Sequence, residues 1–359
     1  MEPVASIIVP TRNRAASLAL TLQSLVAQGL QASYEILIVD NASTDSTRTV
    51  AQGAIAANPG RLVRYVHEPV PGLLSGRHRG ALEAKSNLLI FVDDDIEADS
   101  RWLEALVDSF EDPTVQLVGG PSLLGYDRPL PNWLAGFWTA TRYGGRMCTW
   151  LSLLDLGNCQ IVVDPTFIWG LNFGIRRTAL FAAGGFHPDC IPDNLQHWQG
   201  DGETGLALNA RRLGFRAVYQ PRALVHHRVP ASRLSAEYFE RRGYYQGVCD
   251  SYTEIRAAAY ASLALAVSGE TISWLPSRLM QYAKASVRYA RSVVRQRRKS
   301  FADDRELAEI RERVRRAYVA GFNFHQSTAR RNPEVMEWVL RKDYWNYRLP
   351  ELSRPVYNE

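Results

Sequence analysis

Short runs of Ile, Val and Leu recur through the first 120 residues and are separated by amphipathic stretches. The runs occupy residues 6–9, 35–39, 62–66, 88–92 and 115–118. Nearly continuous apolar runs predict strands buried on both faces of a sheet, and the stretches between them predict helices, for example at 16–26 and 46–57. Alternating buried strands and helices predict an α/β fold, in which a mostly parallel sheet is flanked by helices on both faces.

Short, mostly polar segments follow three of these predicted strands. They are Pro10, Thr11, Arg12 and Asn13 after the first strand, Asp40 after the second, and Asp93, Asp94 and Asp95 after the fourth. Parallel strands end at the same edge of a sheet, and ligands bind in α/β folds at the carboxyl ends of the strands. The sequence therefore predicts a binding site along this edge, which we call the carboxyl rim.

The three consecutive aspartates at 93–95 predict a cation site. Like charges a few ångströms apart repel strongly unless a cation neutralises them. Oxygen ligands without cysteine favour Mg²⁺ or Mn²⁺, which keeps waters and shares its shell with a substrate diphosphate. The alternative is that the aspartates only stabilise the N-terminus of the helix predicted from residue 102.

Three segments occur in an order that is similar to one enzyme family. They are 6–13 (Ser-Ile-Ile-Val-Pro-Thr-Arg-Asn), 38–45 (Ile-Val-Asp-Asn-Ala-Ser-Thr-Asp) and 91–95 (Phe-Val-Asp-Asp-Asp). Together they resemble the inverting glycosyltransferases of family 2, and the likeness extends from residue 5 to about residue 230. The resemblance implies a GT-A fold with a Rossmann-like sheet, followed by a helical C-terminal extension.

The resemblance also implies how the chain is divided. Residues 1–119 are expected to form the nucleotide-sugar-binding half of a GT-A domain, residues 120–232 its acceptor-binding half, and residues 233–359 a helical C-terminal region. Residues 120–175 lose the strand–helix rhythm and are rich in Trp, Tyr, Gly and Pro, which predicts long loops followed by a strand at 171–175.

For the donor, the resemblance implies one group of residues around the nucleotide sugar. The group is Pro10, Thr11, Arg12, Asp40, Arg77, Arg79, Asp93 and Asp94. Asp40 is expected to accept a base N–H, with uracil favoured by the family, although thymine and guanine also offer N–H donors; the alternative for Asp40 is an Asx-turn. Either Arg77 or Arg79 is expected to face the diphosphate, and the alternative for each is a solvated helix charge.

For the metal, the resemblance implies Asp95 as the main ligand, assisted by Asp93 and by a histidine. His226 and His227 end a predicted strand, so their rings point to opposite faces and only one of them can enter the site. Alignment of the following Arg228 favours His227, and the alternative is a histidine that is satisfied elsewhere in the protein.

The catalytic base is expected at the start of a helix predicted near residues 201–213. The family has an adjacent Glu-Asp pair there, whereas this chain reads Gly200-Asp201-Gly202-Glu203. The resemblance assigns the base to Glu203, with Asp201 in reserve, and the alternative is that both carboxylates only cap the helix. A carboxylate would take the proton of the acceptor hydroxyl, and the ion would offset charge on the leaving diphosphate.

Basic residues concentrate near the C-terminus. The net charge is +5, yet residues 276–316 hold 13 Lys or Arg against 5 Asp or Glu, and residues 277–299 hold eight basic and no acidic side chains. Apolar and cationic stripes adjoin in 277–299, which predicts a helix that either contacts a membrane surface or packs on the body of the protein. A second, solvated helix of mixed charge is predicted over 303–319. The Met1-Glu2-Pro3 start has no leader pattern, so we expect a cytoplasmic protein, peripheral at the inner membrane face if 277–299 binds lipid.

The expected function is transfer of a sugar from a nucleoside-diphosphate sugar, with a UDP-sugar favoured, to a hydroxyl of a glycan or lipid-linked acceptor. One alternative is a non-catalytic relative that binds nucleotide sugars. Another is a nucleic-acid-binding protein acting through the basic segment 277–299. The aspartates of the rim would repel nucleic-acid phosphates, so no nucleic-acid partner is expected.

Overall fold

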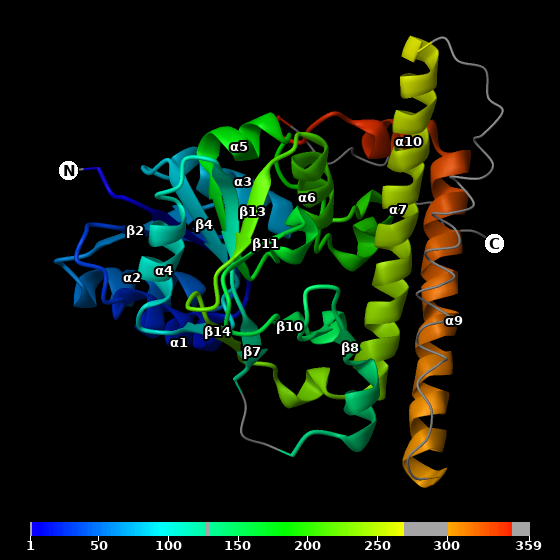
Figure 1. Ribbon diagram of the computed structural model, residues 1–359, viewed down its shortest axis with the longest axis horizontal. Coiled ribbons are helices and arrows are strands. Elements are labelled where there is room, and N and C mark those ends of the chain that lie inside the picture. Colours follow the sequence, from blue (N-terminus) through cyan, green and yellow to red (C-terminus); the bar gives the residue numbers. More distant parts are fainter. Residues whose placement is uncertain (1, 126–128, 269–300, 347–359) are drawn as a thin grey trace.

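The computed structural model describes residues 2–125, 129–268 and 301–346. A large sheet with helices on both faces forms one side of the molecule, and the two long helices α7 and α9 stand beside it (Figure 1). The basic segment 277–299, for which we predicted an amphipathic helix, lies outside the described residues.

The main sheet has eight strands in the order β11-β13-β6-β12-β4-β1-β2-β3. Their bounds are β1 (Ser6–Thr11), β2 (Glu35–Asp40), β3 (Leu62–His67), β4 (Leu88–Val92), β6 (Val115–Gly119), β11 (Ile161–Val163), β12 (Asn172–Arg176) and β13 (Arg216–Tyr219). Strands β1 to β4 pair in parallel, as do β6 and β13, whereas β12 runs antiparallel to β4 and β6 and β11 antiparallel to β13. The predicted mostly parallel sheet is confirmed, and so are its predicted strands.

Helices cover both faces of this sheet, as predicted. One face is covered by α1 (Ala15–Val26), α2 (Thr47–Ala57) and α4 (Trp102–Ser109), and the other by α3 (Leu73–Glu83), α5 (Arg177–Ala182) and α6 (Glu203–Arg212). Every residue of β1 is buried, and successive side chains point to opposite cores. Ile7 and Val9 pack with α1, whereas Ile8 packs with α3. This burial on both faces explains why the strands read as continuous apolar runs.

Four short strands interrupt the long loops predicted for residues 120–175, and together with β5 and β14 they form a second sheet. Its order is β5-β14-β7-β10-β9-β8, with β5 (Ile96–Ala98), β7 (Ser122–Leu124), β8 (Thr139–Ala140), β9 (Arg146–Cys148), β10 (Leu153–Asp155) and β14 (Val225–His227). The loop prediction was wrong because strands of two or three residues are too short to leave a periodic apolar pattern. The strand predicted at 171–175 is confirmed as β12. Short 3-10 helices connect many of these elements: η1 (Asn132–Phe137), η2 (Thr149–Leu151), η3 (Pro165–Phe167), η4 (Asp193–Trp198) and η5 (Ala231–Arg233).

The C-terminal part is helical, as predicted. Its described residues form α7 (Ala236–Ser268), α9 (Phe301–Arg331) and α10 (Pro333–Leu340). The helix predicted over 303–319 is part of α9, but it is not solvated all round, because Ile310 and Val314 are buried with Phe239 of α7. The two long helices approach closely at glycines: a Cβ on Gly247 would lie 2.1 Å from the carbonyl oxygen of Tyr318.

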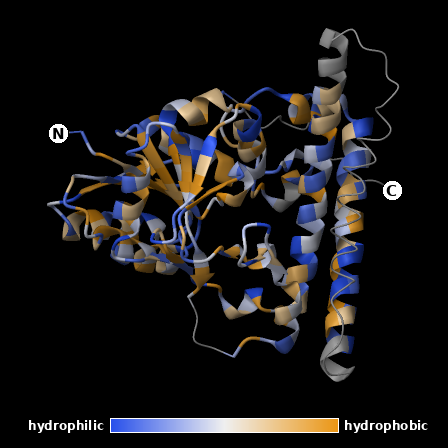
Figure 2. Ribbon diagram, in the orientation of Figure 1, coloured by the Kyte–Doolittle hydropathy of each residue, from blue (hydrophilic) through white to orange (hydrophobic). Residues whose placement is uncertain are grey.

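Hydropathy separates the two parts of the molecule. Figure 2 shows apolar strands at the centre of the sheet, whereas α7 and α9 alternate hydrophilic and hydrophobic residues along their length. Among the helices in the described ranges, none combines the length and the apolar character needed to cross a bilayer. The proposed division at residues 119 and 232 stays a prediction.

Candidate active site

At the carboxyl rim, residues at the end of β1 contact residues that follow β4. Thr11, at the end of β1, donates from Oγ1 to Oδ2 of Asp94 over 2.6 Å. Arg14 reaches both neighbouring aspartates, with Nη1 2.7 Å from Oδ1 of Asp94 and Nη2 2.7 Å from Oδ2 of Asp95. Pro10 is buried against α3, close to Gly76, whereas Arg12 is exposed.

Sequence reasoning missed Arg14, although a signal for it existed. Arg14 directly precedes α1, and a cation is unfavourable at the positive N-terminal end of a helix unless an anion lies nearby. The aspartates after β4 supply that anion. A basic residue at this position therefore pointed to an acidic neighbour on the rim.

Asp95 is the most heavily contacted carboxylate of the triplet. Besides Arg14, its Oδ2 atom lies 3.1 Å from Nη1 of Arg233 and 3.4 Å from Nε2 of His227. Burial alone would raise the pKa of Asp95, but His227, Arg14 and Arg233 outweigh it and hold that pKa well below its ordinary value. The other oxygen, Oδ1, is buried and has no hydrogen-bond partner within the described parts of the chain. Arg233 is the second residue of the site that sequence reasoning missed.

His227 presents the ring nitrogen that a metal ligand needs. Its Nδ1 lies 2.8 Å from the carbonyl oxygen of Leu151, which can only accept, so Nδ1 carries a proton and Nε2 is the ring nitrogen that faces Asp95. The neighbouring His226 is on the other face of β14 and is only partly buried. Of the two histidines, the structure brings His227 to Asp95.

Asp95 and His227 provide some of the ligands that Mg²⁺ or Mn²⁺ needs. Adjacent ligands of an octahedral ion at ~2.1 Å are about 3 Å apart, which is close to the 3.4 Å between Asp95 Oδ2 and His227 Nε2. Oδ1 of Asp95 adds a free buried oxygen. In the described parts of the chain no three His, Cys, Asp or Glu side chains form a complete cage. The remaining ligands would therefore be waters and a substrate diphosphate, as is usual for Mg²⁺.

The three aspartates differ in their tendency to ionise. Burial raises the pKa of Asp94 to about 7, although Arg14 and Thr11 oppose it. Burial also raises the pKa of Asp93, against the attraction of Arg77. Asp95 is thus the aspartate that its surroundings hold most firmly in the charged form.

Glu203 and Arg77 meet at the opposite side of the rim. Arg77 projects from α3 and is buried; its Nη1 lies 3.1 Å from Oε2 of Glu203 and its Nη2 lies 3.7 Å from Oδ1 of Asp93. Glu203 begins α6, and its Oε1 accepts the N–H of Gly170 over 3.3 Å. A Cβ on Gly170 would lie 2.2 Å from Nη2 of Arg77, so a larger residue there would force this guanidinium to shift.

The charge state of Glu203 is set by two opposing effects. Burial would raise the pKa of Glu203, but the charge of Arg77 and the N–H of Gly170 outweigh it and lower that pKa below its ordinary value. The Glu203 side chain retains 29% exposure. It is therefore an ionised carboxylate that solvent, or a substrate, can reach.

Asp201 is placed differently. Its Oδ1 lies 2.7 Å from Nδ1 of His187, and its Oδ2 accepts the hydroxyl proton of Thr253 on α7 over 2.7 Å. The residue is buried. Both of its oxygens thus connect the start of α6 to the neighbouring structure, and neither meets Arg77.

Asp40 lies at the end of β2 with both oxygens engaged. Oδ1 accepts the N–H of Ser43 over 2.9 Å, which is the turn contact that we gave as the alternative, and Oδ2 accepts the hydroxyl proton of Tyr65 over 2.8 Å. Burial, together with the charge of Asp40, raises the pKa of Tyr65 to about 12. Each carboxylate oxygen has two lone pairs, so Asp40 retains capacity for a base N–H.

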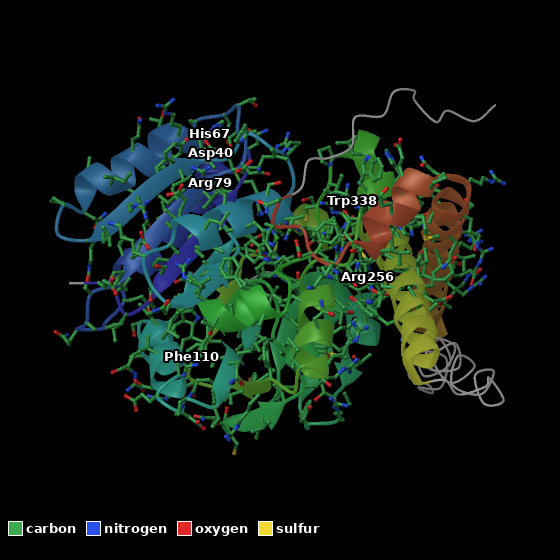
Figure 3. All side chains as sticks on the ribbon, turned by 90° about the horizontal axis from the view of Figure 1, so that it is seen from above. Asp40, His67, Arg79, Phe110, Arg256 and Trp338 are labelled. Atoms are coloured by element: carbon green, nitrogen blue, oxygen red, sulfur yellow. The ribbon has the colours of Figure 1, made fainter. Side chains whose placement is uncertain are left out.

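Arg79 is not brought to the aspartate triplet. It lies on α3, pairs with Glu83 of the same helix over 2.8 Å and is 42% exposed. Figure 3 shows it at the same end of the molecule as Asp40 and His67, away from Arg256 and Trp338. Of the two arginines predicted for the diphosphate, Arg77 is the one that contacts the rim carboxylates.

A mostly parallel sheet whose carboxyl rim holds an aspartate cluster, a histidine and a separate glutamate is the arrangement expected of a GT-A glycosyltransferase domain. Residues 6–180 match the family model "Glycosyl transferase family 2". The match covers just under half of the chain and indicates a glycosyltransferase domain in this part of the protein.

Curated relatives agree with this assignment. Glycosyltransferase AglE of Haloferax volcanii is 31% identical over 197 residues, which are 55% of this chain and 60% of that protein. The glucosyl-dolichyl phosphate glucuronosyltransferase of the same organism is 22% identical over 229 residues, or 63% of this chain and 69% of that protein. The chain thus spans about 60% of the length of AglE.

A solved structure shares the fold. The mannosyltransferase PcManGT from Pyrobaculum calidifontis, in complex with GDP-Man and Mn²⁺, gives a TM-score of 0.52 at 18% sequence identity. The likeness covers 89% of this chain and 87% of that one. It therefore extends beyond the residues that the family model matches.

Proposed function

We propose that this protein transfers a sugar from a nucleoside-diphosphate sugar to a hydroxyl group of a glycan or lipid-linked acceptor, with inversion at the anomeric carbon. The observation that carries the proposal is the ionised, accessible Glu203 carboxylate beside Arg77, on the same rim as Asp95. Inversion needs a base on one face of the sugar and a stabilised leaving group on the other, and the rim supplies both kinds of group.

Glu203 acts as the general base in this proposal. It takes the proton of the acceptor hydroxyl as that oxygen attacks the anomeric carbon, while the bond to the diphosphate breaks. Positioned general bases typically accelerate such steps by ~10² to 10⁴. Asp201, the reserve candidate, is less suited because both of its oxygens are engaged with His187 and Thr253.

Asp95 and His227 would hold Mg²⁺ or Mn²⁺, with Asp93 directed at its waters. The ion supplies Lewis-acid neutralisation of charge on the departing diphosphate. Arg77 lies between Asp93 and Glu203 and is the arginine proposed to orient the diphosphate. Asp94 is engaged with Thr11 and Arg14, so it shapes this part of the rim.

The proposed substrates follow from the chemistry of Asp40 and from the similarity to known proteins. Asp40 favours a base with an N–H donor, and UDP-sugars are the first choice. GDP-sugars belong in the same test because PcManGT was solved with GDP-Man. A lipid-linked acceptor is supported by the name of the Haloferax relative, which specifies a glucosyl-dolichyl phosphate. Membrane contact through 277–299 of a cytoplasmic protein would serve such an acceptor.

Thermal unfolding with UDP-, GDP- and dTDP-sugars, each with and without Mn²⁺, tests the donor site. One nucleotide sugar should stabilise the wild type by ~2.7 kcal/mol at ~100 times its Kd, and only with Mn²⁺. The same nucleotide sugar with Mn²⁺ should stabilise Asp95→Ala only weakly. Asp108→Ala, which removes an exposed carboxylate that pairs with Arg222, should respond as the wild type does. If no nucleotide sugar stabilises the protein, the proposal fails.

Product analysis then tests the transfer. With the stabilising donor and a panel of glycan and polyprenyl-linked acceptors, NMR should detect a product whose anomeric configuration is opposite to that of the donor. A product with retained configuration contradicts the mechanism. Donor binding without transfer to any acceptor favours the non-catalytic alternative.

A further inference from the structure

Arg233 occupies a position that the proposed metal ion needs. Its Nη1 atom lies 3.1 Å from Oδ2 of Asp95 and 3.3 Å from Nε2 of His227, the two atoms assigned above to the ion. Among the described residues, Asp95 is the carboxylate that Arg233 pairs with. A guanidinium thus already serves as the cation between these two groups.

Arg14 does not play the same part, although it also contacts Asp95. Its two nitrogens are divided between Asp94 and Asp95, and it makes no contact with His227. Arg14 therefore holds the two aspartates together. In the described part of the chain, Arg233 is the cationic side chain that contacts both proposed metal ligands, Asp95 and His227.

The contact has an electrostatic consequence. A divalent ion that binds both Asp95 and His227 on the side of Arg233 would have to displace Nη1. An ion elsewhere around Asp95 would still lie within a few ångströms of the guanidinium, and two cations at that distance repel strongly in a partly buried site. Arginine keeps its charge at every relevant pH, so proton loss cannot relieve the repulsion.

Arg233 is also placed where it can move. It is the last residue of η5, between β14 and α7, and its side chain is 27% exposed. Its guanidinium lies 6.0 Å from the ring of Tyr238 on the first turn of α7. A rotamer change would move the charge from Asp95 towards solvent without disturbing the sheet.

We propose that Arg233 is an internal cation that occupies the Asp95–His227 site in the absence of metal and is exchanged for Mg²⁺ or Mn²⁺ when the ion binds. The proposal rests on the metal-assisted function proposed above. Its consequence is that the free enzyme binds the ion weakly, and that the ion binds well only when something else, such as the donor diphosphate, adds negative charge to the site.

Binding of Mn²⁺ alone tests the exchange. Titration followed by electron paramagnetic resonance should show that Arg233→Gln binds Mn²⁺ at least about tenfold more tightly than the wild type without nucleotide, because a nearby positive charge has been removed. Arg233→Lys keeps the positive charge, so its Kd for Mn²⁺ should stay within about threefold of the wild-type value. The matched control is Arg241→Gln, which removes a charge that lies over the same Tyr238 ring but does not contact Asp95. It should bind Mn²⁺ as the wild type does.

Thermal unfolding gives a second readout that needs no substrate. Without metal, Arg233→Gln should melt below the wild type, because Asp95 has lost a cationic partner. Mn²⁺ should remove this difference in melting temperature. Arg241→Gln should show neither the lower melting temperature nor the recovery with Mn²⁺.

Equal or weaker Mn²⁺ binding by Arg233→Gln overturns the exchange and leaves the transferase proposal standing. A metal-free melting loss that Mn²⁺ does not restore also overturns the exchange. If neither the wild type nor Arg233→Gln binds Mn²⁺, the exchange and the proposed metal site fail together.

Discussion

The Nη1 atom of Arg77 lies 3.1 Å from Oε2 of Glu203, although 126 positions separate the two residues in the chain. The same guanidinium lies 3.7 Å from Asp93. One buried cation therefore joins the proposed base to the aspartate triplet, and it holds Glu203 in its ionised form.

Replacing Arg77 should shift the pH dependence of activity. Glu203 can act as the proposed base only when it is ionised, and Arg77 lowers its pKa. In Arg77→Met that pKa rises, so the acidic limb of the kcat/KM profile should move to higher pH, by about one unit or more. Kinetics from pH 4.5 to 8 measure this. Arg79→Met, which removes the exposed partner of Glu83, should leave the limb where it is. An unchanged limb in Arg77→Met would show that Arg77 does not set the charge of the base.

Glu203→Gln should lower kcat by ~10² to 10⁴ and leave the donor Kd within about threefold, because the amide keeps the shape of the side chain but cannot take a proton. Steady-state kinetics and calorimetry measure the two quantities. Asp201→Asn should instead reduce the free energy of unfolding by about 1–3 kcal/mol, because it disturbs the buried contacts with His187 and Thr253. The opposite pattern, with catalysis lost in Asp201→Asn and kept in Glu203→Gln, would reassign the base.

Protonation of His78 should destabilise the fold at acidic pH. Its Nε2 accepts the N–H of Phe186 over 2.9 Å and its Nδ1 lies 3.2 Å from the carbonyl oxygen of Tyr344, so the native ring is neutral. Burial lowers the pKa of His78 from 6.5 to about 3. Between these two pH values the unfolded chain binds a proton at His78 that the folded chain does not bind. The stability that depends on neutral His78 is therefore fully present above pH 6.5 and is lost as the pH falls.

The loss from His78 should amount to about 1.5 kcal/mol between pH 6.5 and pH 5. Urea unfolding at several pH values measures it. In His78→Gln the slope of stability against pH should decrease by about one proton, whereas the exposed His67→Gln should leave it unchanged. A His78→Gln slope equal to that of the wild type would mean that His78 is already charged in the folded protein.

Gly247→Ala should destabilise the α7–α9 pair. The added Cβ would lie 2.1 Å from the backbone oxygen of Tyr318, so the two helices would have to separate, at a cost of about 1–3 kcal/mol. Gly53→Ala is the control, since it lies within α2 and a Cβ there meets nothing within 4 Å. It should stabilise the protein by about 0.5–1 kcal/mol through helix propensity. Thermal unfolding distinguishes the two variants. An unchanged stability of Gly247→Ala would show that α7 and α9 can accommodate the added methyl group.

Much of the sheet could be predicted because its strands are buried on both faces and are therefore apolar throughout. The five strands predicted in the first 120 residues occur in the structure as β1, β2, β3, β4 and β6. The small second sheet could not be predicted in the same way. Strands such as Thr139–Ala140 are two or three residues long, and their pairing depends on distant segments such as Val225–His227.

The sequence by itself determined the location of the rim, because strand ends follow from local hydrophobic patterns and Asp40 and the 93–95 triplet come directly after strands. It also narrowed the base to Asp201 or Glu203 and the histidine to His226 or His227. Only the tertiary structure shows that the two members of each pair have different partners, since a contact such as Asp201 with Thr253 joins elements far apart in the chain. Arg14 and Arg233 entered the site for the same reason: a charged side chain takes its partner from what the fold places beside it, and local sequence does not encode that neighbour.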